Sequence, residues 1–98
     1  MTVTKKAEGS SLTVYLEGRL DTKTAPMLEK ELENSLDGVT ELTFDIEKLV
    51  YISSAGLRVL LSTQKKMRKQ GDMVVKNASE EVMEIFDVTG FSDVLTIV

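Results

Sequence analysis

The sequence predicts an α/β fold in which a mainly parallel sheet is covered by helices. Residues 12–16 and 42–46 alternate apolar and polar side chains, which is the period of a half-buried strand. Each of these segments is followed by one with apolar residues every three or four positions, the period of an amphipathic helix. The predicted order is β-β-α-β-α-β-α-β, and alternation of this kind after a first pair of strands is typical of a mainly parallel sheet.

The first part of the chain is predicted to form a hairpin-like pair of strands and a helix. Val3–Lys6 is expected to be an edge strand that pairs with Leu12–Leu16 across a glycine-containing turn. Pro26 suits the first turn of a helix, because the N–H that proline lacks has no intrahelical partner there. An amphipathic helix is predicted over residues 27–36, with Gly38 placed as its left-handed C-terminal cap.

The middle of the chain is predicted to form a second strand and a second helix. The strand at Leu42–Ile46 is expected to end in a turn, and the short apolar run Leu49–Ile52 follows that turn. The sequence "SSAG" then starts a helix that runs to about residue 70, with four cations in its last turns, where they complement the helix dipole.

The last part of the chain is predicted to form a short strand, a helix and a closing strand. The short strand covers residues 73–75. Ser79 is expected to cap the third helix, which Gly90 ends. The apolar residues of 91–98 predict a final strand.

The composition predicts one soluble domain over residues 1–98 and excludes several chemistries. A chain of 98 residues can enclose one hydrophobic core. Because it has no cysteine and no histidine, it can hold neither a thiolate zinc site nor a Ser-His-Asp triad. No phosphate-binding glycine motif occurs, so we expect no enzyme activity, no cofactor and no metal. The net charge of −4 opposes nucleic acid binding, and the lack of a long apolar run predicts a cytoplasmic protein without membrane insertion.

The stretch "SSAG", Ser53–Gly56, has two compatible interpretations. Ser53 or Ser54 can cap the helix by accepting a backbone N–H bond, which is worth about 1 kcal/mol. A serine at a helix N-terminus is also a favourable site for a phosphate, because free N–H groups and the helix dipole stabilise negative charge. Gly56 disfavours a helix, and we interpret it as a residue that lets the backbone of a partner approach closely.

Two charged features are singled out by their position. Asp21 follows the strand Leu12–Leu16, in a loop that the topology can bring near Ser54, or it organises the turn before Pro26. The basic cluster Lys65–Lys69 is either a solvated helix end or a surface for an acidic partner.

Three motifs and the order of the elements resemble the STAS domain, and within it the small stand-alone anti-sigma factor antagonists of bacteria. The motifs are "GRLD" at Gly18–Asp21, "SSAGLR" at Ser53–Arg58 and "IFDVTGF" at Ile85–Phe91, and the resemblance covers nearly the whole chain. It implies a STAS fold, a mixed and mainly parallel sheet with an N-terminal hairpin-like pair and about three to four helices.

The resemblance implies a regulatory switch. In that family the unmodified domain binds an anti-sigma factor, which is also an ATP-dependent serine kinase, and so releases a sigma factor. Phosphorylation ends the binding and a phosphatase restores it. By motif position the phosphoacceptor is Ser54. The residues expected to bind the partner are Asp21, Thr22, Ser53, Ala55, Gly56 and Arg58.

This chain departs from the family motif at four positions. Ser53 replaces an aspartate, Ala55 a hydroxyl residue, Arg58 a glycine and Arg19 a glutamate. Both loops thereby become more positive, which favours a partner with a more acidic face. The altered motif also leaves open an alternative function, a non-phosphorylated STAS adaptor in a transporter or signalling complex.

Overall fold

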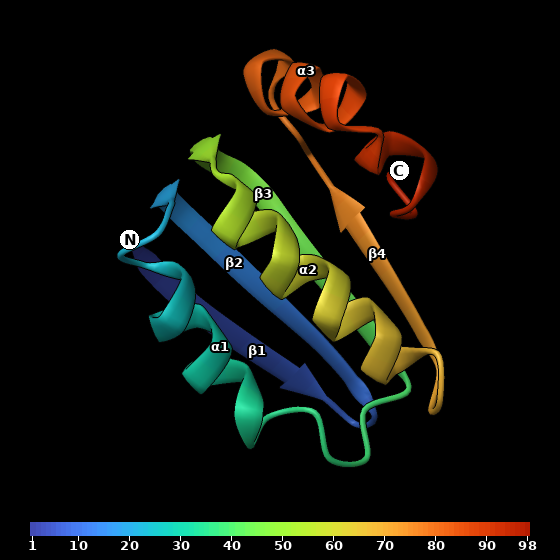
Figure 1. Cartoon of the computed structure of the whole chain (residues 1–98). Coiled ribbons are helices and arrows are strands. Elements are labelled where there is room, and N and C mark those ends of the chain that lie inside the picture. Colours follow the sequence, from blue (N-terminus) through green and yellow to red (C-terminus); the bar gives the residue numbers. More distant parts are fainter.

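The computed structural model describes residues 1–98 and contains one four-stranded sheet with helices packed against it (Figure 1). The strands lie in the order β1-β2-β3-β4, where β1 is antiparallel to β2 and the other neighbours are parallel. The elements are β1 Thr2–Glu8, β2 Ser11–Leu20, α1 Ala25–Glu33, β3 Glu41–Ile52, α2 Ser54–Met67, β4 Asp72–Lys76, α3 Glu80–Thr89 and a 3-10 turn at Phe91–Asp93. The predicted fold class, hairpin and helix order are confirmed.

One face of the sheet carries the hydrophobic core. In β2 and β3 the alternating side chains of one face are buried, whereas those of the other face are polar and partly exposed. Helices α1 and α2 lie side by side on the buried face, and α3 lies beyond the end of β4 (Figure 1). The buried apolar residues form one cluster, whose fully buried members include Phe44, Phe86 and Leu28. Burying such a side chain contributes about 1.5–3 kcal/mol.

β3 is one continuous strand, so the predicted turn after Ile46 is wrong. Its pairing with β2 shifts register twice, and at each shift β3 carries one more residue than β2. These are β-bulges, which bend a strand and change the face to which the following side chains point. Leu49 and Ile52 therefore remain buried although they break the simple alternation, and the extra residue Val50 is exposed.

The predicted final strand over residues 91–98 is also wrong. Gly90 ends α3 in the left-handed conformation, with φ of 80°, and the 3-10 turn follows at once. Only Ile97 then forms a β-bridge, with Val75 of β4. The 3-10 turn takes up the first residues of the predicted strand. The end of the chain therefore pairs with the edge of β4 through a single bridge.

Gly38 does not cap α1, which ends at Glu33 and has Asn34 as its C-terminal cap. Gly38 has φ of 77° and lies in a separate turn, in which the Val39 N–H donates to the carbonyl oxygen of Leu36 at 3.1 Å. The left-handed conformation was predicted correctly, but it serves the connection to β3 rather than the helix end.

Candidate functional site

The candidate site lies where β2 and β3 end side by side. Leu20 and Ile52, the last residues of these strands, are paired, and the Ser53 N–H donates to the carbonyl oxygen of Leu20 at 2.9 Å. The loop that begins at Asp21 and the start of α2 therefore meet at the carboxyl edge of the sheet (Figure 1). Ligands of parallel sheets are commonly bound at this edge.

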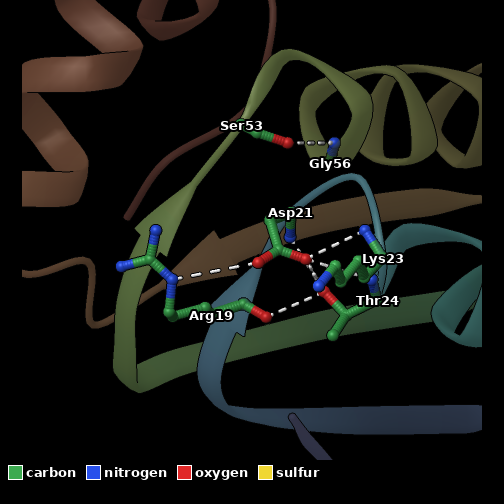
Figure 2. Close-up of polar contacts among 6 residues, drawn as sticks. All are labelled: Arg19, Asp21, Lys23, Thr24, Ser53 and Gly56. Carbon is green, nitrogen blue, oxygen red and sulfur yellow. Dashed lines mark hydrogen bonds and ion pairs between the residues drawn. The ribbon is translucent and has the colours of Figure 1, made fainter.

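The two serines of this edge have different structural roles. Ser53 is the N-cap of α2: its backbone is extended and its hydroxyl oxygen accepts from the Gly56 N–H at 3.5 Å, a long hydrogen bond (Figure 2). Ser54 is the first helical residue, its side chain is exposed, and its hydroxyl makes no hydrogen bond within the chain. The cap is thus Ser53, and the Ser54 hydroxyl is free to react.

Gly56 is buried at the contact between α2 and the sheet, which contradicts its interpretation as a point of approach for a partner. A Cβ atom at this position would lie 2.6 Å from Cγ of Leu20 and 2.9 Å from Cγ1 of Ile52. Both neighbours are fully buried core residues that have no room to move aside. The glycine therefore allows the first turn of α2 to rest on the ends of β2 and β3.

Asp21 organises its own loop. Its Oδ1 accepts from the backbone N–H of Lys23 at 3.0 Å and of Thr24 at 3.1 Å (Figure 2). The Asp21 N–H in turn donates to Oγ1 of Thr24 at 2.8 Å. The Thr24 hydroxyl lies within hydrogen-bond distance of both the Arg19 carbonyl oxygen and Asp21 Oδ1, and its single proton serves one of them at a time. This is the turn-forming role that the sequence left as an alternative.

These contacts favour the ionised form of Asp21. The Thr24 N–H is the main cause that lowers the pKa of the Asp21 carboxyl below its ordinary value. Partial burial opposes this effect, while the Lys23 N–H, the Thr24 hydroxyl and the charge of Arg19 add to it. The carboxylate is consequently a stable part of the loop at neutral pH.

Arg19 joins the two strand ends on the sheet face opposite the core. Its guanidinium carbon lies 4.4 Å from the ring centroid of Tyr51, the residue with which it is paired across β2 and β3. Its Nε also lies 3.8 Å from Oδ2 of Asp21. Sequence analysis noted only the charge of Arg19, because the two bulges in β3 determine that Tyr51 is opposite it.

Three of the predicted partner-binding residues line one groove between α1 and α2. Thr22, Ala55 and Arg58 lie along this groove, which has a volume of about 320 Å³. Pro26, Glu29 and Ser62 also line it and were not predicted. Ser62 follows the predicted Arg58 by one helical turn, so helical spacing could have identified it, whereas no predicted residue lies one turn before Glu29.

The acidic residues of the chain do not gather into a possible metal site. None of the helices is both long and apolar enough to cross a bilayer.

The fold and the site match a known family over nearly the whole chain. Residues 2–98 match the family model described as the STAS domain, and the chain belongs to this family. The protein is 36% identical over 88 residues to BtrV of Bordetella bronchiseptica, which is named as a candidate anti-sigma factor antagonist. That alignment covers 88% of this chain and 76% of BtrV.

A second relative and a solved structure agree with this assignment. The anti-sigma-B factor antagonist of Bacillus subtilis is 30% identical over 93 residues, which are 94% of this chain and 85% of the relative. The structure of the Bacillus cell fate determinant SpoIIAA in its phosphorylated form superposes with a TM-score of 0.76. It covers 99% of this chain and 91% of SpoIIAA at 16% identity, a likeness that concerns the fold.

Gly56→Ala is expected to destabilise the protein by about 1–2 kcal/mol. The added methyl group overpacks the contact with Leu20, which costs about 1–3 kcal/mol, and the better helix propensity of alanine returns at most about 1 kcal/mol. Urea unfolding measures the change. Ser62→Ala, at an exposed position of the same helix, is the control. A Gly56 variant as stable as the wild type would contradict the packing role.

Ser53→Ala and Ser54→Ala are expected to differ in stability. Loss of the long cap bond of Ser53 costs about 0.5–1 kcal/mol, whereas loss of the unbonded Ser54 hydroxyl changes the free energy of unfolding by less than about 0.5 kcal/mol. Thermal and urea unfolding of both variants provide the measurement. Ser79→Ala, which removes the cap of α3, is the matched control for a lost cap. A larger effect at Ser54 than at Ser53 would reverse the assignment.

Asp21→Asn is expected to reduce the acid sensitivity of the fold. Because the folded-state pKa of Asp21 is lowered, its ionisation stabilises the native state above about pH 4, and this stabilisation is lost as the pH falls through the folded-state pKa. The stability difference between wild type and variant should be constant from about pH 5 to 7 and should shrink below about pH 4. Urea unfolding across this range tests it, and a difference that stays constant to about pH 2.5 would contradict it.

Proposed function

We propose that this protein is an anti-sigma factor antagonist, which binds an anti-sigma factor and thereby releases a sigma factor. Membership of the STAS family and two relatives named as antagonists, each aligned over most of its length, support this function. The observation that carries the proposal is the free, exposed Ser54 hydroxyl at the head of α2, next to a separate capping residue. In this proposal residues 1–98 act as one STAS domain in the cytoplasm, by binding rather than by catalysis and without a cofactor.

Ser54 is the proposed phosphoacceptor. Its side chain is accessible to a kinase, and the first N–H groups of α2 have no acceptor within the helix. A phosphate placed there meets both these N–H groups and the positive end of the helix dipole. Arg58 lies one helical turn further on, on the same side of α2, so that its guanidinium can pair with the phosphate. The SpoIIAA fold has been solved in a phosphorylated form, which supports this kind of regulation in a similar scaffold.

Phosphorylation would switch off binding by changing charge at a close contact. A phosphate adds about −1.5 to −2 charges and three acceptor oxygens, which a surface that had packed against a neutral hydroxyl cannot accommodate. The partner is proposed to be an anti-sigma factor that is also the serine kinase, and a phosphatase would restore the active form. The proposed docking surface includes Thr22, Ala55 and Arg58 along the groove, while Ser53 caps the helix that carries Ser54 and Asp21 positions its loop.

Phosphorylation by the anti-sigma factor kinase of the same organism, with ATP and mass spectrometry of the product, tests the proposal. We expect one phosphate, located on Ser54, that is absent in Ser54→Ala and retained in the matched variant Ser53→Ala. Isothermal titration should show that Ser54→Asp binds the kinase at least tenfold more weakly than the wild type.

Two outcomes would overturn this assignment. Phosphate on Ser53, with Ser54 unmodified, would show that Ser53 and not Ser54 is the phosphoacceptor. A kinase that neither binds nor modifies the protein would exclude partner switching and favour the non-phosphorylated adaptor.

A further inference from the structure

Helix α2 and the turn that follows it present a row of basic side chains to solvent. Arg58, Lys65, Lys66 and Lys69 are exposed, and with Leu61 and Ser62 they line an open hollow of about 350 Å³. We call these six residues the basic stripe. Since an α-helix has 3.6 residues per turn, Ser54, Arg58 and Lys65 lie on one side of α2, and Lys69 lies in the turn that follows Met67. The stripe thus starts one turn from Ser54, extends about 12 Å along the helix to Lys66, and ends at Lys69 in the following turn.

None of the cations of the basic stripe forms an ion pair within the chain. The three ion pairs of the protein are Lys5–Glu31, Lys6–Glu8 and Arg19–Asp21, so no stripe residue takes part in one. Helix α2 contains no acidic residue, although the whole chain carries a net charge of −4. Positive charges are therefore concentrated on one helix face of an otherwise acidic protein.

The stability of the isolated helix does not account for this arrangement. Cations in the last turn interact favourably with the helix dipole, which applies to Lys65 and Lys66. Arg58, in contrast, lies near the positive N-terminal end of α2. Lys65 and Lys66 in the last turn and Lys69 just after it also carry like charges close together, which repel each other. The helix dipole thus explains Lys65 and Lys66 but not Arg58, and the repulsion between neighbouring cations favours a role for the stripe in binding.

We propose that the basic stripe binds a carboxylate-rich surface of the protein that also contacts Ser54, an inference that rests on the proposed function. Rows of opposite charge accelerate association and select the correct partner. Leu61 is only partly buried at the centre of the stripe and offers the apolar contact that protein interfaces place inside a charged rim.

A protein surface fits the stripe better than a nucleic acid does. The acidic remainder of the chain repels a phosphate backbone, which extends well beyond the stripe. Helix α2 also has no aromatic side chain on which a base could stack. Carboxylates confined to one helix or loop of a partner avoid this repulsion.

The stripe also connects charge to phosphorylation. A phosphate on Ser54 lies one turn from Arg58 and competes with the carboxylates of the partner for the same guanidinium. Phosphorylation of Ser54 would therefore neutralise the charge of Arg58 in the stripe and also obstruct the contact at Ser54.

Binding of the anti-sigma factor kinase to charge variants tests the stripe. We expect Lys65→Glu/Lys69→Glu to bind at least tenfold more weakly than the wild type in 50 mM NaCl. The control Lys30→Glu/Lys48→Glu changes the net charge equally, at exposed positions outside α2, and should bind like the wild type. The difference should largely disappear in 500 mM NaCl, because salt screens exposed charges. Equal affinities of the two double variants would overturn the proposal, and circular dichroism confirms that both are folded.

A second experiment separates the stripe from the proposed function. The ¹⁵N-labelled protein is titrated with a 15-residue glutamate-rich peptide, a single-stranded RNA of 15 nucleotides and vesicles containing phosphatidylglycerol. We expect the peptide to shift the amide signals of residues 58–69, and the shifts to be absent in Lys65→Glu/Lys69→Glu. A peptide without effect, or tighter binding of the RNA or the vesicles, would overturn the proposal even if the kinase phosphorylates Ser54. If the kinase does not bind at all, the proposed function fails. The peptide titration still shows whether the basic stripe binds carboxylates.

Discussion

The contact between the first turn of α2 and the ends of β2 and β3 is the constraint on which the rest of the site depends. The absent side chain of Gly56 lets the helix rest on Leu20 and Ile52, and the backbone bond from Ser53 to Leu20 fixes the chain just before it. These contacts determine where α2 starts and in which direction it runs. The positions of Ser54, of the groove beside α1 and of the basic stripe all follow from them.

The loop between β2 and α1, which begins at Asp21, is held by its own polar contacts rather than by the core. Asp21 and Thr24 bond each other and the local backbone, so the loop has a defined shape although its surroundings are largely exposed. Arg19 then connects this loop to Tyr51 on the neighbouring strand. A partner that binds at this edge therefore meets two preorganised loops, which reduces the entropy lost on association.

Regular periodicity made most of the fold predictable, and the failures occur where a second interaction interrupts it. The alternation in β2 was clear because this strand has no extra residue, whereas the two bulges in β3 shift its pattern and imitate a turn. At Gly56 the sequence marked an unusual residue correctly but gave no information about its neighbours. The side-chain direction of Asp21 was left open for the same reason, since it depends on where Thr24 lies in space.

The separate roles of Ser53 and Ser54 have a consequence for how a binding partner could recognise a modified form of this domain. Because Ser53 holds the helix end, a chemical change at Ser54 does not have to loosen the fold to be detected. In the proposed switch, the modified and unmodified forms can therefore share one backbone conformation. A switch of this kind would be read by its partner as a difference in surface charge rather than as a change of fold.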